Sequence, residues 1–198
     1  MPPNTGKGVP ANRTEIHPVS EWESVLHFWF TEIEPAQWWK KDALFDGEIA
    51  ARFTELHGRA QQGELFTWRE QARGRLAEII LLDQFSRNIY RDDSRAFAWD
   101  GMALLLAQEA VRAGADQALT AVEKSFMYLP YMHSESALIH EQAIVLFSQP
   151  GLENNLKFEY RHKDIIERFG RYPHRNIVLG RDSTDEEIEF LKQPGSSF

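Results

Sequence analysis

The chain of 198 residues is long enough for one domain with a sizeable core, and its 42% hydrophobic content, with thirteen Phe, six Trp and five Tyr, is typical of a packed globular protein. Its net charge of −8 argues against general nucleic-acid binding, which requires a cationic surface. Because the chain has no cysteine, disulfides, thiolate nucleophiles and cysteine-based zinc sites are excluded.

The sequence predicts three regions: a flexible leader (1–18), a single helical domain (19–192) and a flexible tail (193–198). The leader contains four of the nine prolines and no apolar run, so it lacks the pattern of a signal peptide. The longest apolar runs, such as 79–82, are too short to span a bilayer. We therefore expect a cytoplasmic protein that has no membrane partner.

Apolar residues recur with helical spacing along the chain, and no sustained stretch alternates with the period of a β-strand. Four stripes follow the spacing i, i+3, i+4, i+7 or a close variant. In chain order they are formed by Trp22, Val25, Leu26 and Trp29; by Phe45, Ile49, Phe53 and Leu56; by Ala98, Met102, Leu105 and Leu106; and by Phe158, His162, Ile165, Ile166 and Phe169. This predicts an all-α fold of about eight helices in antiparallel pairs, as in a tetratricopeptide-like array, although no 34-residue consensus recurs.

Helix boundaries are also marked by residue type. Gly114 is expected to end one helix and Gly170 another, because glycine adopts the left-handed conformation that follows a helix. Pro130 is expected to end a short helix over 122–129. Ser183 or Thr184 is expected to cap the last helix in a capping box.

Two polar clusters lie where apolar residues are expected. On one predicted helix, Asp83 and Arg87 continue the apolar stripe of Leu76 and Ile80, so they form either a structural clamp between helices or part of a pocket wall. The second cluster is the segment 128–135, whose His133 and Glu135 we expect near a helix N-terminus, where the backbone favours an anion. Simple helix capping explains Glu135 better than it explains His133.

The segment from Phe169 to Thr184 is the richest candidate. Arginine forks beside a helix N-terminus suit the recognition of carboxylate or phosphate. The alternative is that these arginines tie helix ends together by pairing with acidic residues. The polar residues of this segment are Arg171, His174, Arg175, Asn176 and Arg181.

Three stretches in this order, Leu82–Asn88, Tyr128–Glu135 and Arg168–Arg181, resemble the uncharacterised bacterial family known as domain of unknown function 924. Residues 25–30 and 38–39, near the start of the predicted domain, also fit the pattern of this family, so the resemblance covers nearly all of residues 20–191. One departure is Tyr172, where the family often has phenylalanine. The resemblance implies a helical, tetratricopeptide-like fold, and it implies no reaction, substrate or catalytic residue.

Three functions stay open on the sequence. We predict first a binding protein for a small anionic ligand or a peptide end, with no cofactor and no metal site. The residues expected to bind it are Asp83, Arg87, Asn88, Tyr128, His133, Glu135, Arg171, His174, Arg175, Asn176 and Arg181. The second is a hydrolase or transferase that uses a histidine as general acid or base, with His133, His162 and His174 as candidates. The third is a protein-interaction module whose groove involves Trp38, Trp39 or Trp68.

Overall fold

The computed structural model describes residues 20–198, and every regular element in this part of the chain is helical. The prediction of an all-α fold is therefore confirmed for these residues. The expected leader, 1–18, lies outside them. No helix within 20–198 is both long and apolar enough to cross a membrane.

The α-helices follow one another with short connections. They are α1 (Glu21–His27), α2 (Ala43–Gln61), α3 (Ala72–Ile80), α4 (Ser86–Ile89), α5 (Asp100–Arg112), α6 (Ala121–Met132), α7 (Ala137–Phe147), α8 (Glu153–Phe169) and α9 (Asp185–Leu191). The π-helical turn Leu81–Phe85 joins α3 to the single turn α4, so these segments form one long helix and the prediction of about eight helices holds. A second π-helical turn spans Phe28–Glu32, and short 3₁₀ segments span Pro35–Trp39, Phe66–Glu70, Ser94–Phe97, Ala115–Ala118 and Pro173–Arg175.

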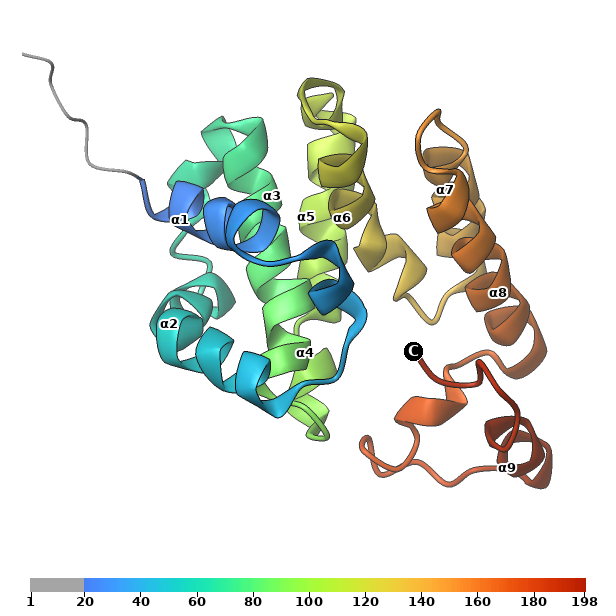
Figure 1. Cartoon of the computed structure of the whole chain (residues 1–198). Coiled ribbons are helices and arrows are strands. Elements are labelled where there is room, and N and C mark those ends of the chain that lie inside the picture. The colour runs from blue at the N-terminus through green and yellow to red at the C-terminus, as the bar shows by residue number, and fades with distance from the viewer. Residues whose placement is uncertain (1–19) are drawn as a thin grey trace, which may run out of the picture.

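The helices lie side by side largely in chain order, from α1 and α2 at one end to α7 and α8 at the other (Figure 1). Helix α3 packs against α1, α5 and α6, and the contacts then run from α6 to α7 and from α7 to α8. The segment that carries the 3₁₀ turn Pro173–Arg175 leads from α8 to α9 at the edge of the array. This order brings the segment after α8 close to the ends of α5 and α6.

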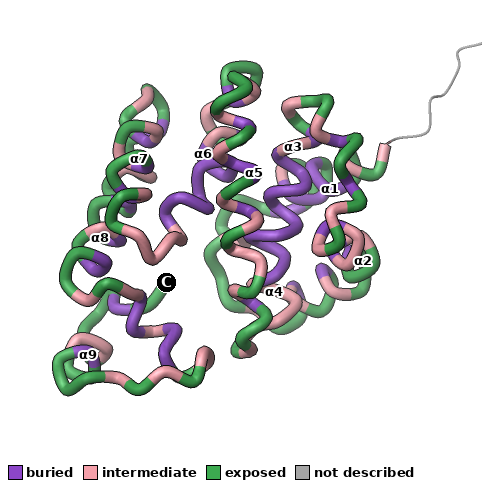
Figure 2. Tube along the Cα trace, turned by 180° about the vertical axis from the view of Figure 1, so that it is seen from behind, coloured by how far each residue is buried: buried purple, intermediate pink, exposed green. Residues whose placement is uncertain are grey.

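The core is centred on α3 and α6, which are the most continuously buried helices (Figure 2). Aromatic side chains from distant segments meet in it, with Phe28, Trp29, Phe45, Phe53, Phe85 and Phe126 all buried. Burial of one such side chain stabilises the fold by about 1.5–3 kcal/mol. A smaller cluster of Ile165, Ile166 and Tyr172 packs with residues of α9 at the edge of the array.

Three of the predicted boundaries are confirmed. Gly114 and Gly170 adopt φ of 69° and 68° directly after α5 and α8. Thr184 caps α9 in a capping box with Glu187. The prediction for Pro130 is wrong, because α6 continues through it to Met132. Residues 128–132 are all buried, so packing outweighs the backbone hydrogen bond that proline cannot donate.

The π-helical turn Leu81–Phe85 places polar groups inside the protein. All five of its residues are buried, including Asp83 and Gln84. An α-helix presents one face to the core, and the extra residue of a π turn allows neighbouring positions to face inward together. The start of α3 is equally constrained, since a Cβ at Gly74 would lie 2.2 Å from the Trp68 carbonyl oxygen.

Candidate functional site

A pocket of about 290 Å³ lies between the start of α5, the end of α6 and the segment after α8. Its wall combines apolar and charged side chains. The lining residues are Phe97, Asp100, Gly101, Leu104, Pro130, His133, Ser134, Glu135, Arg175 and Leu179. Two of the three predicted polar clusters contribute to this wall directly, and the third lies behind it.

Asp83 is the buried anchor behind the pocket. Its Oδ1 lies 2.8 Å from Nδ1 of His133, and Gln84 donates to its Oδ2 over 2.5 Å. The Arg87 guanidinium lies 3.3 Å from the same carboxylate. Burial would raise the pKa of Asp83, but the charges and hydrogen bonds of these neighbours outweigh burial and hold the pKa below its usual range. The carboxylate is therefore ionised at neutral pH.

Asp100 at the start of α5 forms salt bridges with two arginines, Arg87 and Arg175. Arg87 donates to both of its oxygens over 3.0 Å, and Nη1 of Arg175 donates to Oδ2 over 3.3 Å. Burial lowers the pKa of Arg175, and the nearby charge of Arg87 lowers it further. One carboxylate thus serves two guanidinium groups, and Arg175 has the longer contact.

Arg175 is only 5% exposed and lines the pocket. Its guanidinium carbon lies 4.6 Å from the ring centroids of both Phe97 and Tyr172, so two aromatic rings contact the cation. Its Nη2 donates to the carbonyl oxygen of His133 over 3.0 Å, whereas its buried Nε has no partner within residues 20–198. A buried donor without an acceptor costs about 1–3 kcal/mol, so this guanidinium is incompletely bonded within the protein.

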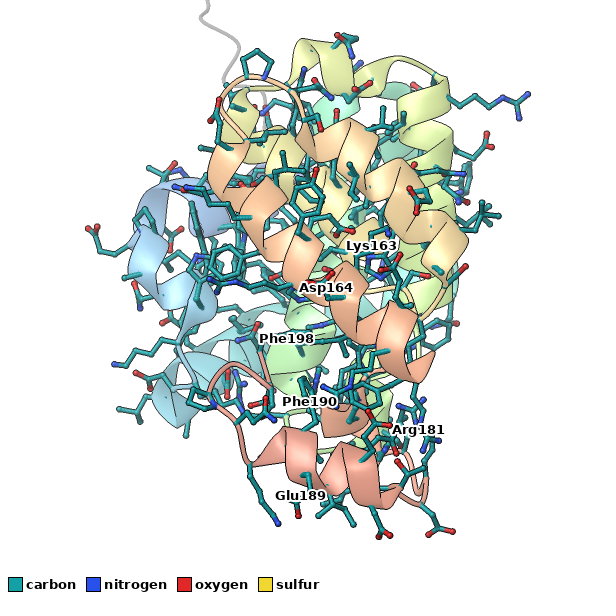
Figure 3. All side chains as sticks on the ribbon, turned by 90° about the vertical axis from the view of Figure 1, so that its right-hand side faces the viewer. Lys163, Asp164, Arg181, Glu189, Phe190 and Phe198 are labelled. Carbon is teal, nitrogen blue, oxygen red and sulfur yellow. The ribbon has the colours of Figure 1, made fainter. Side chains whose placement is uncertain are left out.

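Glu135 and Arg181 form a two-pronged ion pair at the pocket rim, with contacts of 2.7 and 2.9 Å. The backbone N–H of Tyr172 also donates to Glu135, over 2.8 Å. Burial would raise the pKa of Glu135, but these hydrogen bonds and the arginine charge lower it. Figure 3 shows Arg181 at the edge of the molecule, near α9. The pair ties the segment after α8 to the α6–α7 connection.

Other polar residues of the segment from Phe169 to Thr184 bond to groups of the protein and hold helices together. Arg171 binds both carboxylate oxygens of Glu187 over 2.6 and 2.7 Å. Asn176 is fully buried and donates to Ser183 and Glu187. These contacts attach α9 to the array, so the tether interpretation describes Arg171, Asn176 and Arg181, whereas Arg175 faces the pocket.

Two predicted ligand-binding residues lie elsewhere. Asn88 donates to Asp46 on α2 over 2.8 Å. The hydroxyl of the fully buried Tyr128 donates to Asp116 over 2.6 Å. No residue of α4 lines the pocket, and Tyr128 lies two positions before the pocket-lining Pro130, on a different face of α6.

His162 and His174 do not line the pocket either. Nδ1 of His162 lies 2.7 Å from the carbonyl oxygen of Phe158, one helical turn before it. The ring of Phe198 covers both histidines, at centroid distances of 3.8 Å from His162 and 4.5 Å from His174 (Figure 3 labels Phe198). Burial lowers the pKa of each histidine to about 3, so both are neutral at physiological pH. The expected tail, 193–198, thus packs its last ring on the domain.

Sequence reasoning missed three titratable residues of this region. Asp100 gave no local signal, since an acidic residue in the first turn of a helix is common. The buried pair of His140 and Glu159, 2.6 Å apart, was also missed. Their place among apolar residues of α7 and α8 could have revealed them, as it revealed Asp83.

The tryptophans proposed for a partner groove do not form one exposed surface. Trp68 is buried, Trp38 is half-buried and its indole N–H donates to the Trp29 carbonyl oxygen, and Trp39 is 62% exposed. Within the described part of the chain, no group of three or more His, Asp or Glu side chains is placed to hold a metal ion.

The described part of the chain is therefore an all-helical protein with one pocket wall of mixed apolar and charged side chains. Residues 25–195 match the family described as "Bacterial protein of unknown function (DUF924)", and the chain belongs to this family. It is also similar to a solved structure described as "Structure of Protein of Unknown Function ATU0120 from Agrobacterium tumefaciens", with 39% identity and a TM-score of 0.82. That match covers 86% of this chain and 96% of the other. A search of curated proteins found no match.

Proposed function

We propose that the pocket binds a small molecule through a carboxylate group held by Arg175. The observation that carries this proposal is the state of the Arg175 side chain. It is buried in the pocket wall, two aromatic rings contact it, and its Nε has no acceptor among the described residues. A planar guanidinium presents its N–H donors in a fixed fork, and a carboxylate matches that geometry.

The charges around Arg175 favour a carboxylate over a phosphate. Asp100 and Glu135 line the same pocket and form salt bridges with arginines. A phosphate monoester carries a charge between −1.5 and −2 at pH 7, so it would meet stronger repulsion from these carboxylates than a monoanion would. The apolar side chains of Phe97, Leu104 and Leu179 offer a surface for a short hydrocarbon chain.

Thermal unfolding with matched six-carbon probes tests this function. Hexanoate is expected to raise the Tm of the wild-type protein, whereas hexylamine and hexyl phosphate are not. A ligand at one hundred times its Kd stabilises the folded state by about 2.7 kcal/mol. The rise should be lost in Arg175→Lys, since lysine lacks the guanidinium fork, and it should be kept in Arg181→Met, which removes a tether arginine.

Two results would contradict the proposal: no effect of hexanoate on the wild type, or an equal effect in Arg175→Lys. Circular dichroism establishes that both variants are folded before the comparison. If Arg175→Lys does not fold, NMR chemical-shift changes in wild-type protein must map hexanoate to Phe97 and Leu179. Changes located elsewhere would also reject the site.

We further infer that the helix order is tetratricopeptide-like, because α5 packs against α6, α6 against α7, and α7 against α8. We also propose a cytoplasmic location, which the composition of the chain supports.

A further inference from the structure

His133 has the geometry of an oriented acid–base residue. Its Nδ1 lies 2.8 Å from Oδ1 of Asp83, which is fully buried and is also held by Gln84 and Arg87. An ionised carboxylate accepts hydrogen bonds and cannot donate one. Nδ1 of His133 therefore carries the proton, and Nε2 carries the lone pair.

The second ring nitrogen of His133 makes no hydrogen bond to the described residues, and the residue lines the pocket. Nε2 has no partner within residues 20–198, the side chain keeps 13% of its surface exposed, and it forms part of the pocket wall. Burial lowers the pKa of His133, and Arg87 adds to this, while Asp83 and Asp100 act in the opposite direction. The lowered pKa keeps the ring neutral at pH 7, so the lone pair is free to accept a proton.

The other two histidines proposed as catalytic lack this arrangement. Neither lines the pocket, both are covered by the ring of Phe198, and neither is bonded to a carboxylate among the described residues. An orienting carboxylate fixes the tautomer and stabilises the imidazolium that forms after proton transfer. Of the three candidates, His133 alone combines an orienting group with access to the pocket.

No side chain in the described part of the chain is bonded to Nε2 of His133, although Ser134 follows it and lines the same pocket. A protein nucleophile activated by this nitrogen would have to lie within hydrogen-bond distance of it. Water from the open side of the pocket is therefore the nucleophile that the geometry suits. The Ser134 hydroxyl is a donor available to a developing oxyanion.

We propose that this pocket hydrolyses a carboxylic ester whose acyl part carries a second carboxylate, with His133 as the general base. The proposal rests on the proposed function, since Arg175 holds that second carboxylate. The water oxygen bonds to the ester carbon while one water proton moves to Nε2 of His133. The bond to the leaving alkoxide then breaks, and His133 returns the proton to the alkoxide oxygen. The products are one carboxylic acid and one alcohol, and Asp83 stays ionised throughout.

The wall of the pocket favours an ester of this class over a phosphate ester. Asp100 and Glu135 repel a highly charged phosphoryl group, whereas an ester carbonyl is neutral. An alkoxide is also a better leaving group than an amide nitrogen, so one histidine suffices to supply the single proton that it needs.

The test compares two chromogenic esters that differ in one carboxylate, mono-4-nitrophenyl adipate and 4-nitrophenyl hexanoate. Wild-type protein is expected to release 4-nitrophenolate from the adipate ester with kcat/KM about 100-fold or more above that of His133→Gln. His27→Gln is the matched control, because His27 is an exposed residue of α1 outside the pocket, and it should be unchanged. The preference for the adipate ester should be lost in Arg175→Lys. In the wild type, kcat/KM should fall on acidification at a lower pH than an ordinary histidine would give, because burial lowers the pKa of His133.

Equal turnover by the wild type and His133→Gln would overturn the inference, as would no turnover at all. If hexanoate still raises the Tm in that case, the binding function stands and only the catalytic inference fails. If hexanoate has no effect either, both fail. The tautomer of His133 can also be measured in the wild type by ¹⁵N NMR, without any variant. The ring should carry its proton on Nδ1 at pH 7. Protonation on Nε2 would reject the base.

Discussion

The ion pair between Arg181 and Glu135 offers the sharpest test of how the arginine segment is held. It joins two segments 46 residues apart through contacts of 2.7 and 2.9 Å, and its side chains are 24% and 27% exposed. We propose to change the pair in a double-mutant cycle of Arg181→Met, Glu135→Gln and the double variant. The cycle isolates the energy of the pair from the other contacts of each residue.

The expected coupling energy follows from burial. Exposed ion pairs contribute about 0.2–1 kcal/mol, and hydrogen bonds to charged groups contribute about 1.5–3 kcal/mol. Because about three quarters of each side chain is buried and two short bonds are made, we expect a coupling of about 1–2 kcal/mol. Arg181→Met alone should cost more than the coupling, since Arg181 also donates to the Tyr172 carbonyl oxygen and to Asn176.

Urea unfolding at pH 7, followed by circular dichroism, measures the four free energies of unfolding. The exposed pair of Arg168 and Glu186, with a 2.8 Å contact and side chains 47% and 62% exposed, provides a matched control cycle. Its coupling should be about 0.5 kcal/mol or less. The reasoning is refuted if the Arg181 pair gives less than about 0.3 kcal/mol, or if the two cycles give the same value at constant m.

Three further predictions concern the fold and its titrations. Gly74→Ala should lower the free energy of unfolding by more than about 2 kcal/mol, because its methyl group would lie 2.2 Å from a backbone oxygen. Gly47→Ala, with no atom within 4 Å of the new methyl group, should raise the free energy of unfolding by about 0.5–1 kcal/mol. Equal effects of the two variants in urea unfolding would contradict this. The hydrogen bond from Arg171 lowers the pKa of Glu187 to about 2, so the stability that this group adds is present above pH 4.5 and is lost as the pH falls toward 2. Glu187→Gln should therefore flatten that part of the curve of unfolding free energy against pH, and an unchanged slope would count against this role of Glu187. Phe198→Ala should raise the pKa of His174 from about 3 toward 6.5, because burial is the main cause of the low value, and an NMR titration that shows no change would disprove the covering role of the ring.

Much of the helical order could be predicted from the sequence because it depends on near neighbours. Gly114, Gly170 and the capping box of Thr184 end or begin helices through bonds that reach only three or four residues. The stripe of Leu76, Ile80 and Asp83 likewise predicted that Asp83 faces inward, and it is fully buried.

Local signals failed where packing decides the conformation. Pro130 should end a helix on local grounds, yet its neighbours on both sides are buried and α6 continues. The π-helical turn Leu81–Phe85 has no mark in the sequence, and within this turn Gln84 is buried as well as Asp83. The energy of packing a whole helix exceeds the preference of a single residue.

The pattern of residues along the chain shows which polar groups are unusual, whereas the packing of the helices sets the partners of those groups. Arg175 and Arg181 lie six residues apart in one arginine-rich segment, and the sequence treats them alike. In the folded chain Arg181 is neutralised by Glu135, whereas Arg175 shares Asp100, 75 residues away, with another arginine. Ion pairing depends on distance in space, which the order of helices sets. The folded topology therefore separates the arginine that faces the pocket from those that hold helices together.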